Sequence, residues 1–311
     1  WTQTVLFLVS QDDDITTTNS EVLEDMGEID NGDPQTLSDF IIWAVTNFPA
    51  KKHALILSDH GAGWQGGWTD NSPNEGSALS VDEIDGALAT ALAETGQEQL
   101  EFIGFDACLM SQVEALTGVA PYARYAVASE ETEPAMGWAY AAFLGELAED
   151  PGRDGAELAK SIVDSYINQD IRIQDDEQRA EYLAQVYGVE EEVSAEEVGA
   201  AASQDVTLTA VDLQAMPAYM DALNEFAFAL TSVDPLAVAQ ARTYAQSYTS
   251  VFGEEAPPSF LDVGHFASLV SELAESKELN TAVKSLQKAA GKLILAEMHG
   301  PNKPGSTGLT F

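Results

Sequence analysis

Short apolar runs alternate with longer segments of helical spacing through the first half of the chain. Residues 5–9, 54–57, 102–105 and 125–128 are apolar without polar alternation, which is typical of strands covered on both faces. Between the first two runs, residues 36–48 repeat apolar side chains at helical spacing. This order predicts an α/β fold with a mainly parallel sheet and helices on its faces.

The second half of the chain is predicted to be mostly helical. Helical patterns cover residues 156–166, 216–230 and further segments up to Met298, and a very acidic stretch spans 175–197. Residues 207–213 alternate between apolar and polar, and they predict a strand that returns to the sheet edge. Because no repeat and no proline- or serine-rich linker separates the halves, a second independent domain is not required.

The chain is strongly acidic. Thirteen lysines and arginines stand against 52 aspartates and glutamates, which gives a net charge of −39. Such a field repels nucleic acid and anionic membrane surfaces and attracts cationic peptides. It is also typical of a protein that meets concentrated salt, because salt screens self-repulsion. We favour this high-salt environment as the cause, and it is compatible with a cationic substrate.

The sequence predicts a soluble protein with a full core. Hydrophobic residues make up 45% of the 311 positions, and no apolar stretch approaches the roughly 20 residues that a membrane-spanning helix needs. Residues 1–10 lack the basic, apolar and small-residue zones of a signal peptide. Cys108 is the single cysteine, so an intramolecular disulfide is excluded.

A histidine and the single cysteine each follow the end of a predicted strand. His60 comes after the run at 54–57, and Cys108 comes after the run at 102–105 and directly before a helical pattern at 110–119. Strand ends of a parallel sheet lie at one edge, where α/β folds place their sites. A thiol beside an imidazole and a helix N-terminus is favoured as a thiolate nucleophile. The backbone N–H groups of Cys108 and Gly61 are candidates for an oxyanion hole, since glycine permits close approach.

Three segments around these residues resemble the hallmark segments of clostripain-type peptidases. They are HGAGW at 60–64, GFDACLM at 104–110, and ASEETEP at 128–134 followed by Gly137 and Trp138. Weaker similarity runs through residues 32–40 and on to Phe311. The resemblance therefore covers nearly the whole chain.

The resemblance implies a caspase-like αβα sandwich and a His60/Cys108 dyad that cleaves peptide bonds after arginine or lysine. Residues 1–150 would form the catalytic core, which would lack a first strand upstream of Trp1. Residues 151–311 would be its helical continuation, and 308–311 resemble a final strand cut short. The acidic S1 pocket of the family maps best onto Asp106, Ser129 and Glu131, because a carboxylate can bind guanidinium in a charge-assisted pair.

The resemblance also implies where the protein acts, whether it needs a cofactor and whether it cuts itself. Relatives are commonly exported, so we expect a secreted or cell-surface monomer that acts on peptides or proteins with basic residues. No cofactor is required, although some relatives use calcium. Family members often cut themselves at a basic residue between the histidine and the cysteine, but residues 61–101 contain no lysine or arginine. Self-processing in that segment is therefore not expected.

Two other functions are considered. Residues 61–66 match the G-x-G-x-x-G dinucleotide pattern, but a loop rather than a helix is predicted to follow, which argues against it. A catalytically silent binding or surface protein that keeps the fold is the alternative from another class. The acidic residues at 12–14 could hold calcium, yet no EF-hand loop is present and no metal ligands are assigned.

Overall fold

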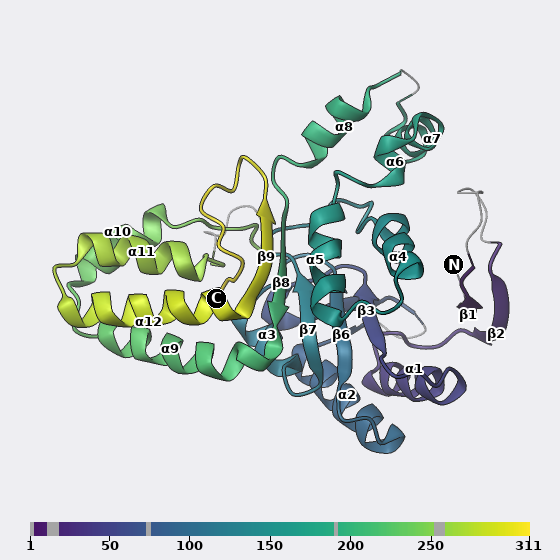
Figure 1. Cartoon of the computed structure of the whole chain (residues 1–311), viewed down its shortest axis with the longest axis horizontal. Helices are drawn as coiled ribbons and strands as arrows, with labels where there is room; N and C mark the ends of the chain where they lie inside the picture. Colours follow the sequence, from purple (N-terminus) through teal and green to yellow (C-terminus); the bar gives the residue numbers. More distant parts are fainter. Residues whose placement is uncertain (1–2, 11–18, 73–75, 190–191, 252–258) are drawn as a thin grey trace.

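A five-stranded mixed sheet forms the centre of the molecule (Figure 1). The computed structural model describes residues 3–10, 19–72, 76–189, 192–251 and 259–311. The strands of the sheet lie in the order β3 (Ala54–Ser58), β6 (Leu100–Asp106), β7 (Ala123–Ala128), β8 (Thr207–Asp212) and β9 (Ile294–His299). The first three are parallel, β8 is antiparallel to β7, and β9 is antiparallel to β8. The predicted parallel sheet is confirmed for the three strands at the site.

Helices cover both faces of this sheet. On one face, Leu57 and Ile103 join a cluster with side chains of the following helices: α1 (Pro34–Asn47), α2 (Val81–Thr95), α3 (Val113–Val119), α9 (Met216–Leu230), α10 (Pro235–Tyr244), α11 (Val263–Leu273) and α12 (Lys277–Leu293). On the other, Phe102 and Leu208 join a second cluster with α4 (Tyr140–Glu149), α5 (Gly155–Ser165), α6 (Ile171–Gln174), α7 (Asp176–Tyr187) and α8 (Ala195–Ala202). Alternate residues of one strand thus enter opposite cores, which is the expected αβα sandwich.

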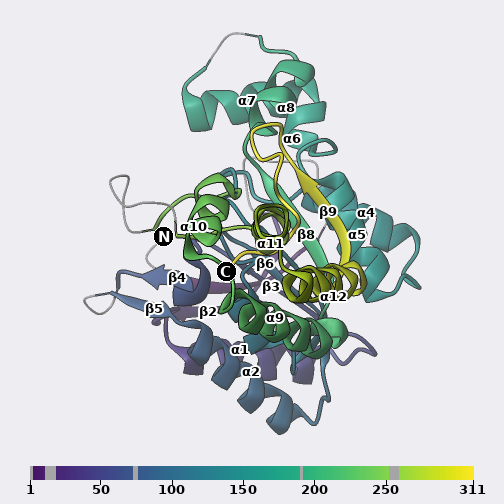
Figure 2. The same cartoon turned by 90° about the vertical axis from the view of Figure 1, so that its left-hand side faces the viewer.

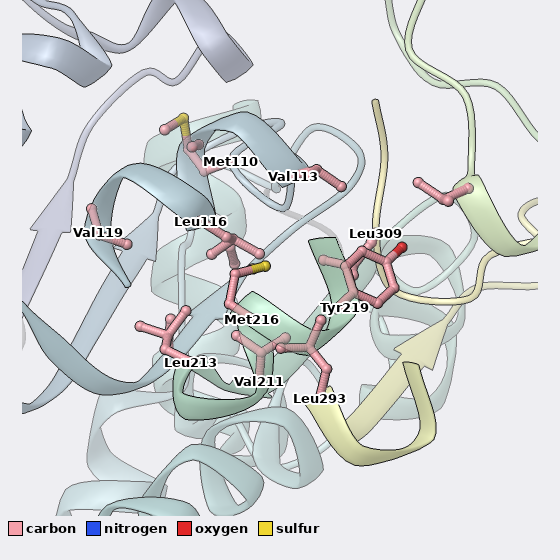
Figure 3. Close-up of a cluster of buried hydrophobic side chains, with 14 of the residues drawn as sticks. Met110, Val113, Leu116, Val119, Val211, Leu213, Met216, Tyr219, Leu293 and Leu309 are labelled. Carbon is pink, nitrogen blue, oxygen red and sulfur yellow. The ribbon is translucent and has the colours of Figure 1, made fainter. Parts of the chain in front are cut away.

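The core on the first face joins the two halves of the chain. Leu116 of α3 and Met216 at the start of α9 point toward one another, with Val211 of β8 and Leu293 of α12 beside them (Figure 3). All four side chains are at most 2% exposed. Burial of this kind stabilises a fold by about 25 cal/mol for each Å² of apolar surface removed from water.

Local sequence signals fix the starts of two helices. Asp33 caps α1 by accepting from the Gln35 N–H, and Pro34 occupies the first turn. Ser80 and Glu83 form the reciprocal capping box that their spacing predicts at the start of α2. The acidic stretch at 175–197 contains α7 and the first residues of α8, as its pattern indicates.

Residues 5–9 were predicted to form a strand of the central sheet, and this position is wrong. They form β1 (Thr4–Leu8), which pairs only with β2 (Glu21–Gly27) in a separate antiparallel hairpin beside α1 (Figure 1). The side chains of β1 are half-buried or exposed. An apolar run alone does not show which strand will pair with it, and here the partner is a local one.

The prediction for the end of the chain is also wrong in part. Residues 294–299 were expected to be helical but form β9, which pairs with β8. For this reason β8 is an interior strand and not the sheet edge. Leucine, alanine, glutamate and methionine favour helices, and tertiary pairing overrides that preference here. Thr310 forms isolated bridges to Gln112 and Asp262 in place of a regular strand.

The hairpin of β4 (Gly67–Asp70) and β5 (Ser77–Leu79) lies next to the end of β3 (Figure 2). A 3-10 turn at Gly63–Gln65 precedes it, so the glycine-rich run at 61–66 is followed by a strand and no helix opens there. The dinucleotide reading is therefore not supported. Across the described ranges, every helix is too short or too polar to traverse a lipid bilayer.

Candidate active site

The register of two parallel strands brings the predicted dyad segments together. Ser58, the last residue of β3, pairs with Asp106, the last residue of β6. His60 and Cys108 therefore each lie two residues beyond a paired position, at the same edge of the sheet. The Asp59 N–H donates to the Asp106 carbonyl oxygen at 3.3 Å, which extends the contact past the strand ends.

The backbone of Gly61 packs directly against Cys108. A Cβ at position 61 would overlap with the Cys108 carbonyl oxygen and would lie 3.1 Å from the Ala107 Cβ, so only glycine fits. Gly61 also bridges Gly67, but the bonds of that bridge are made by the His60 carbonyl and the Ala62 N–H. Within the described residues, the Gly61 and Cys108 N–H groups have no backbone acceptor. Both are therefore available as oxyanion donors.

Cys108 was expected at a helix N-terminus, but it lies in a turn. The helix α3 begins only at Val113. The intervening residues make sheet-like bonds, since the Ser111 N–H donates to the Ser129 carbonyl and the Val113 N–H donates to the Thr310 carbonyl. Leu109 adopts a left-handed backbone with a φ of 65°. Such a conformation costs on the order of 1–3 kcal/mol in a non-glycine residue, and this kind of strain gathers at functional sites.

The Cys108 thiol is half-buried and free. The backbone N–H of Glu133 donates to its sulfur at 3.3 Å, and a donor in this place favours negative charge on the sulfur. On another side the residue packs against a small apolar cluster of Leu109, Tyr248 and Phe260. The backbone amide thus supplies the support for a thiolate that the helix dipole was expected to give.

Asp106 is buried close to Cys108 in sequence and in space. It is 6% exposed, and its Oδ2 accepts hydrogen bonds from the Tyr140 hydroxyl at 2.8 Å and from the Ser58 hydroxyl at 3.2 Å. Gly137 has a φ of 63°, and a Cβ there would lie 2.8 Å from both Asp106 carboxylate oxygens. The glycine therefore leaves room for the carboxylate, which a Cβ at this position would displace.

Glu133 is a site residue that the sequence analysis missed. Both of its carboxylate oxygens are buried and make no hydrogen bond of regular geometry among the described residues, although Asp106 and Trp138 lie close enough to affect its ionisation. Burial, together with the charges of Asp106 and Cys108, raises the pKa of Glu133 well above its usual range. The Trp138 Nε1 and the Tyr166 hydroxyl are also buried without a partner in the described part of the chain. Unsatisfied polar groups of this kind are rare in native cores, and they indicate a site for a polar ligand.

Ser129 and Glu131, the other predicted pocket residues, are engaged in building the loop. The Ser129 hydroxyl donates to the Glu131 carbonyl at 2.8 Å and contacts the Thr207 hydroxyl at 2.9 Å. The Glu131 carboxylate forms an ion pair with Lys303 and accepts the Thr249 N–H at 3.2 Å. Their role in S1 stays a prediction, and these contacts favour Glu133 as the second pocket carboxylate.

The remaining histidines take structural places. His53 contacts the Phe48 carbonyl at 3.1 Å, and His265 accepts the Gln246 N–H at 3.0 Å near the start of α11. His299 was expected at a helix end but ends β9, where it contacts Glu297 at 2.9 Å. The acidic residues at 12–14 lie outside the described residues. In the described ranges, no group of three or more histidine, cysteine or acidic side chains is arranged to hold a metal ion.

Comparison with known proteins identifies the family. The sequence matches the model of the Clostripain family over residues 4–306. The chain belongs to the clostripain family. As a member of that family it is a cysteine peptidase. In this clostripain-family chain, the register of β3 and β6 brings the segments that carry His60 and Cys108 to the same edge of the sheet.

Solved structures agree on the fold of this clostripain-family peptidase. A secreted C11 cysteine protease from Bacteroides thetaiotaomicron, in complex with an irreversible peptide inhibitor, is similar with a TM-score of 0.65 and 15% identity. The match covers 99% of this chain and 81% of that chain. An inactive zymogen C11 protease from Parabacteroides distasonis has a TM-score of 0.60 and 16% identity, covering 99% of this chain and 76% of that chain. No curated protein matches the sequence.

Proposed function

We propose that this protein is a cysteine endopeptidase that cleaves peptide bonds after arginine or lysine through a dyad of Cys108 and His60. The observation that carries the proposal is the β3–β6 register, which places both residues two positions beyond the Ser58–Asp106 pair. The fixed contact between Gly61 and Cys108 supports it, because it holds the two loops together.

In the proposed mechanism, the Cys108 thiolate attacks the carbonyl carbon and the carbon–nitrogen bond breaks. His60 protonates the leaving amine, and it then activates the water that hydrolyses the thioester. The N–H groups of Gly61 and Cys108 bind the oxyanion, a contribution that is typically worth about 2.7–4 kcal/mol for one donor. The Glu133 N–H supports the resting sulfur. No cofactor takes part in any step, and a calcium requirement remains a separate expectation.

Selectivity for basic residues is proposed to come from Asp106 and Glu133. Both carboxylates are buried near the nucleophile, and neither forms an ion pair with a lysine or arginine of the described chain. A guanidinium or ammonium entering there would gain a charge-assisted hydrogen bond and would relieve the repulsion between the two acids. A neutral or acidic side chain would leave buried charge uncompensated.

We further propose that the enzyme is exported and does not cut itself within residues 61–101. The similar Bacteroides thetaiotaomicron protease is described as secreted. Because residues 61–101 contain no lysine or arginine, activity toward basic residues cannot cut that segment. Mass spectrometry of the protein after prolonged incubation should find residues 61–101 intact, and a cut within them would contradict both the specificity and this expectation.

A panel of peptide amides tests the proposal. Amides of arginine, lysine, leucine and glutamate should be cleaved in the order arginine or lysine first and glutamate last. Cys108→Ala should abolish turnover and His60→Ala should reduce it by several orders of magnitude, while both variants keep the wild-type unfolding midpoint. Equal cleavage of all four amides would overturn the basic specificity. Absence of cleavage by the wild-type protein would favour the silent binding protein.

A further inference from the structure

A second pocket opens beside His60, apart from the Asp106–Glu133 cluster. It has a volume of about 490 Å³ and lies between α1, the end of β3 and the β4–β5 hairpin. Its walls include Ser58 and Asp59 of β3 and its exit loop, Phe40 of α1, and Trp68 and Asp70 of β4. Figure 2 shows the hairpin at the side of the sheet, beside the β3 strand. The Ser58 hydroxyl, which donates to Asp106, stands between the two sites.

Trp68 lines this pocket and carries an indole N–H without an acceptor in the described part of the chain. The side chain is only 7% exposed, and its Nε1 has no hydrogen-bond partner among the described residues. Its ring packs on Phe105 with centroids 5.8 Å apart, and its backbone is left-handed with a φ of 54°. A buried donor without an acceptor destabilises the fold. Phenylalanine would fill the same apolar space without this cost, so the indole N–H indicates a ligand with an acceptor.

The charge of the pocket indicates a cation. Asp59 and Asp70 line it, and neither forms an ion pair within the described residues. Hydrogen bonds from the Asn31 and Ser72 backbone lower the pKa of Asp70, so its carboxylate stays ionised. Acidic pocket walls are common in a chain with a net charge of −39, so the charge of the walls alone does not identify a binding site. The combination with a buried N–H donor at the same pocket fits a peptide residue, whose carbonyl accepts and whose basic side chain pairs with the acids.

The position of the pocket assigns it to one side of the scissile bond. A general acid must contact the leaving nitrogen, so the chain beyond the scissile bond leaves over His60. Asp59 directly precedes His60 and lines the pocket, whereas Asp106 and Glu133 hold the residue on the acyl side. With a rise of about 3.3 Å for each extended residue, the first or second leaving-group residue is the one that reaches it.

We propose that this pocket binds a lysine or arginine on the leaving-group side of the scissile bond, with Trp68 donating to the substrate backbone and Asp59 and Asp70 facing the cation. The proposal rests on the proposed function, since it adds a second specificity site to the same dyad. The enzyme would then prefer pairs or clusters of basic residues.

Three substrates separate this inference from the peptidase assignment. One is an arginyl amide with a small leaving group, and two are peptides with arginine on the acyl side and either lysine or leucine in the next two positions. We expect kcat/KM for the lysine peptide to exceed that for the leucine peptide about tenfold, since a charged pair of 1.4 kcal/mol gives that factor. The preference should fall as sodium chloride is raised from 0.05 to 1 M, because the pair is partly exposed.

Two variants locate the effect. Asp59→Asn should reduce the lysine-to-leucine ratio to about threefold or less, since it removes one of the two charges. Trp68→Phe should lower kcat/KM for both peptides relative to the amide. For each variant, kcat/KM for a peptide is divided by kcat/KM for the amide. This corrects for any effect on the dyad, because Asp59 also accepts the backbone N–H of His60. The exposed Asp221 on α9 gives the control Asp221→Asn, which should leave every ratio unchanged.

A wild-type ratio near one, with the amide still cleaved, overturns the pocket assignment and leaves the dyad intact. A ratio that Asp59→Asn does not change also overturns it. If neither the amide nor the peptides are cleaved, the peptidase proposal fails and this inference fails with it. Unfolding midpoints of both variants equal to that of the wild type exclude misfolding as the cause of any loss.

Discussion

Two glutamates on one loop, only two residues apart, both have buried carboxylates but differ in how these are paired. Glu131 is neutralised by Lys303 and by the Thr249 N–H. Glu133 lies on the nucleophile side of the loop, and its carboxylate makes no hydrogen bond of regular geometry among the described residues. Burial alone therefore does not identify a functional acid. A carboxylate with its partner in the chain builds structure, and one whose partner is missing awaits a ligand.

The largest expected effect is on the structural side. Lys303→Met leaves Glu131 buried without its cation, and this should lower the free energy of unfolding by about 3–5 kcal/mol. Urea denaturation at pH 8 measures it, and Lys288→Met on the exposed face of α12 is the matched control. If both variants unfold at the wild-type midpoint, the ion pair carries no stability and the comparison fails.

On the functional side, Glu133→Gln should lower kcat/KM for an arginyl amide by about ten- to a hundredfold, since one charged hydrogen bond is worth roughly 1.5–3 kcal/mol. Stability should not fall, because glutamine fills the same space without the cost of burying an acid that has no cation beside it. Glu131→Gln should show the reverse pattern, with a loss of stability and an unchanged preference for arginine over leucine. Identical behaviour of the two variants would remove the distinction between these glutamates.

The pH dependence of stability sharpens the same contrast. The pKa of Glu133 is raised on folding, so its contribution to stability is full below the unfolded pKa of about 4.3 and is lost as pH rises through the folded pKa. Each unit of that rise corresponds to about 1.4 kcal/mol. The unfolding midpoint of the wild type should therefore fall relative to Glu133→Gln between pH 4 and 8. Parallel pH curves would argue against burial of an unpaired acid.

Ser129→Ala should give the smallest effect. It removes hydrogen bonds to the Glu131 carbonyl and the Thr207 hydroxyl, at a cost of about 1 kcal/mol. Thermal unfolding should detect this loss, while kcat/KM for arginyl and lysyl amides should stay within twofold of the wild type. A large loss of arginine selectivity at unchanged stability would instead place the Ser129 hydroxyl in the substrate pocket.

The sequence predicts that the His60 and Cys108 segments meet at one sheet edge, because strand ends and glycines are local signals. Residues 54–57 and 102–105 are short apolar runs, and the histidine and cysteine that follow them share an edge wherever the runs pair in parallel. The pocket residues are harder. Glu131 and Glu133 are two residues apart in one loop, so the local sequence does not show which of them lines the substrate pocket. They are distinguished by the contact of Glu131 with Lys303, which lies 172 residues away in sequence.

Other parts of the fold could not be predicted for similar reasons. The strand β9 has a helix-favouring composition, and its partner β8 lies far from it in sequence. The apolar run of β1 resembles a central strand, although its partner is the neighbouring β2. The start of α3 was placed too early, because the bonds from Ser111 to Ser129 and from Val113 to Thr310 hold the residues before Val113 in sheet-like pairing.

The most direct test of the central claim is cleavage of an arginyl amide before and after complete alkylation of Cys108, the single cysteine. Mass spectrometry establishes that one alkyl group has been added at residue 108. We expect cleavage before alkylation and none after it, with an unchanged unfolding midpoint. Full activity of the completely alkylated protein would contradict the assignment of Cys108 as the nucleophile.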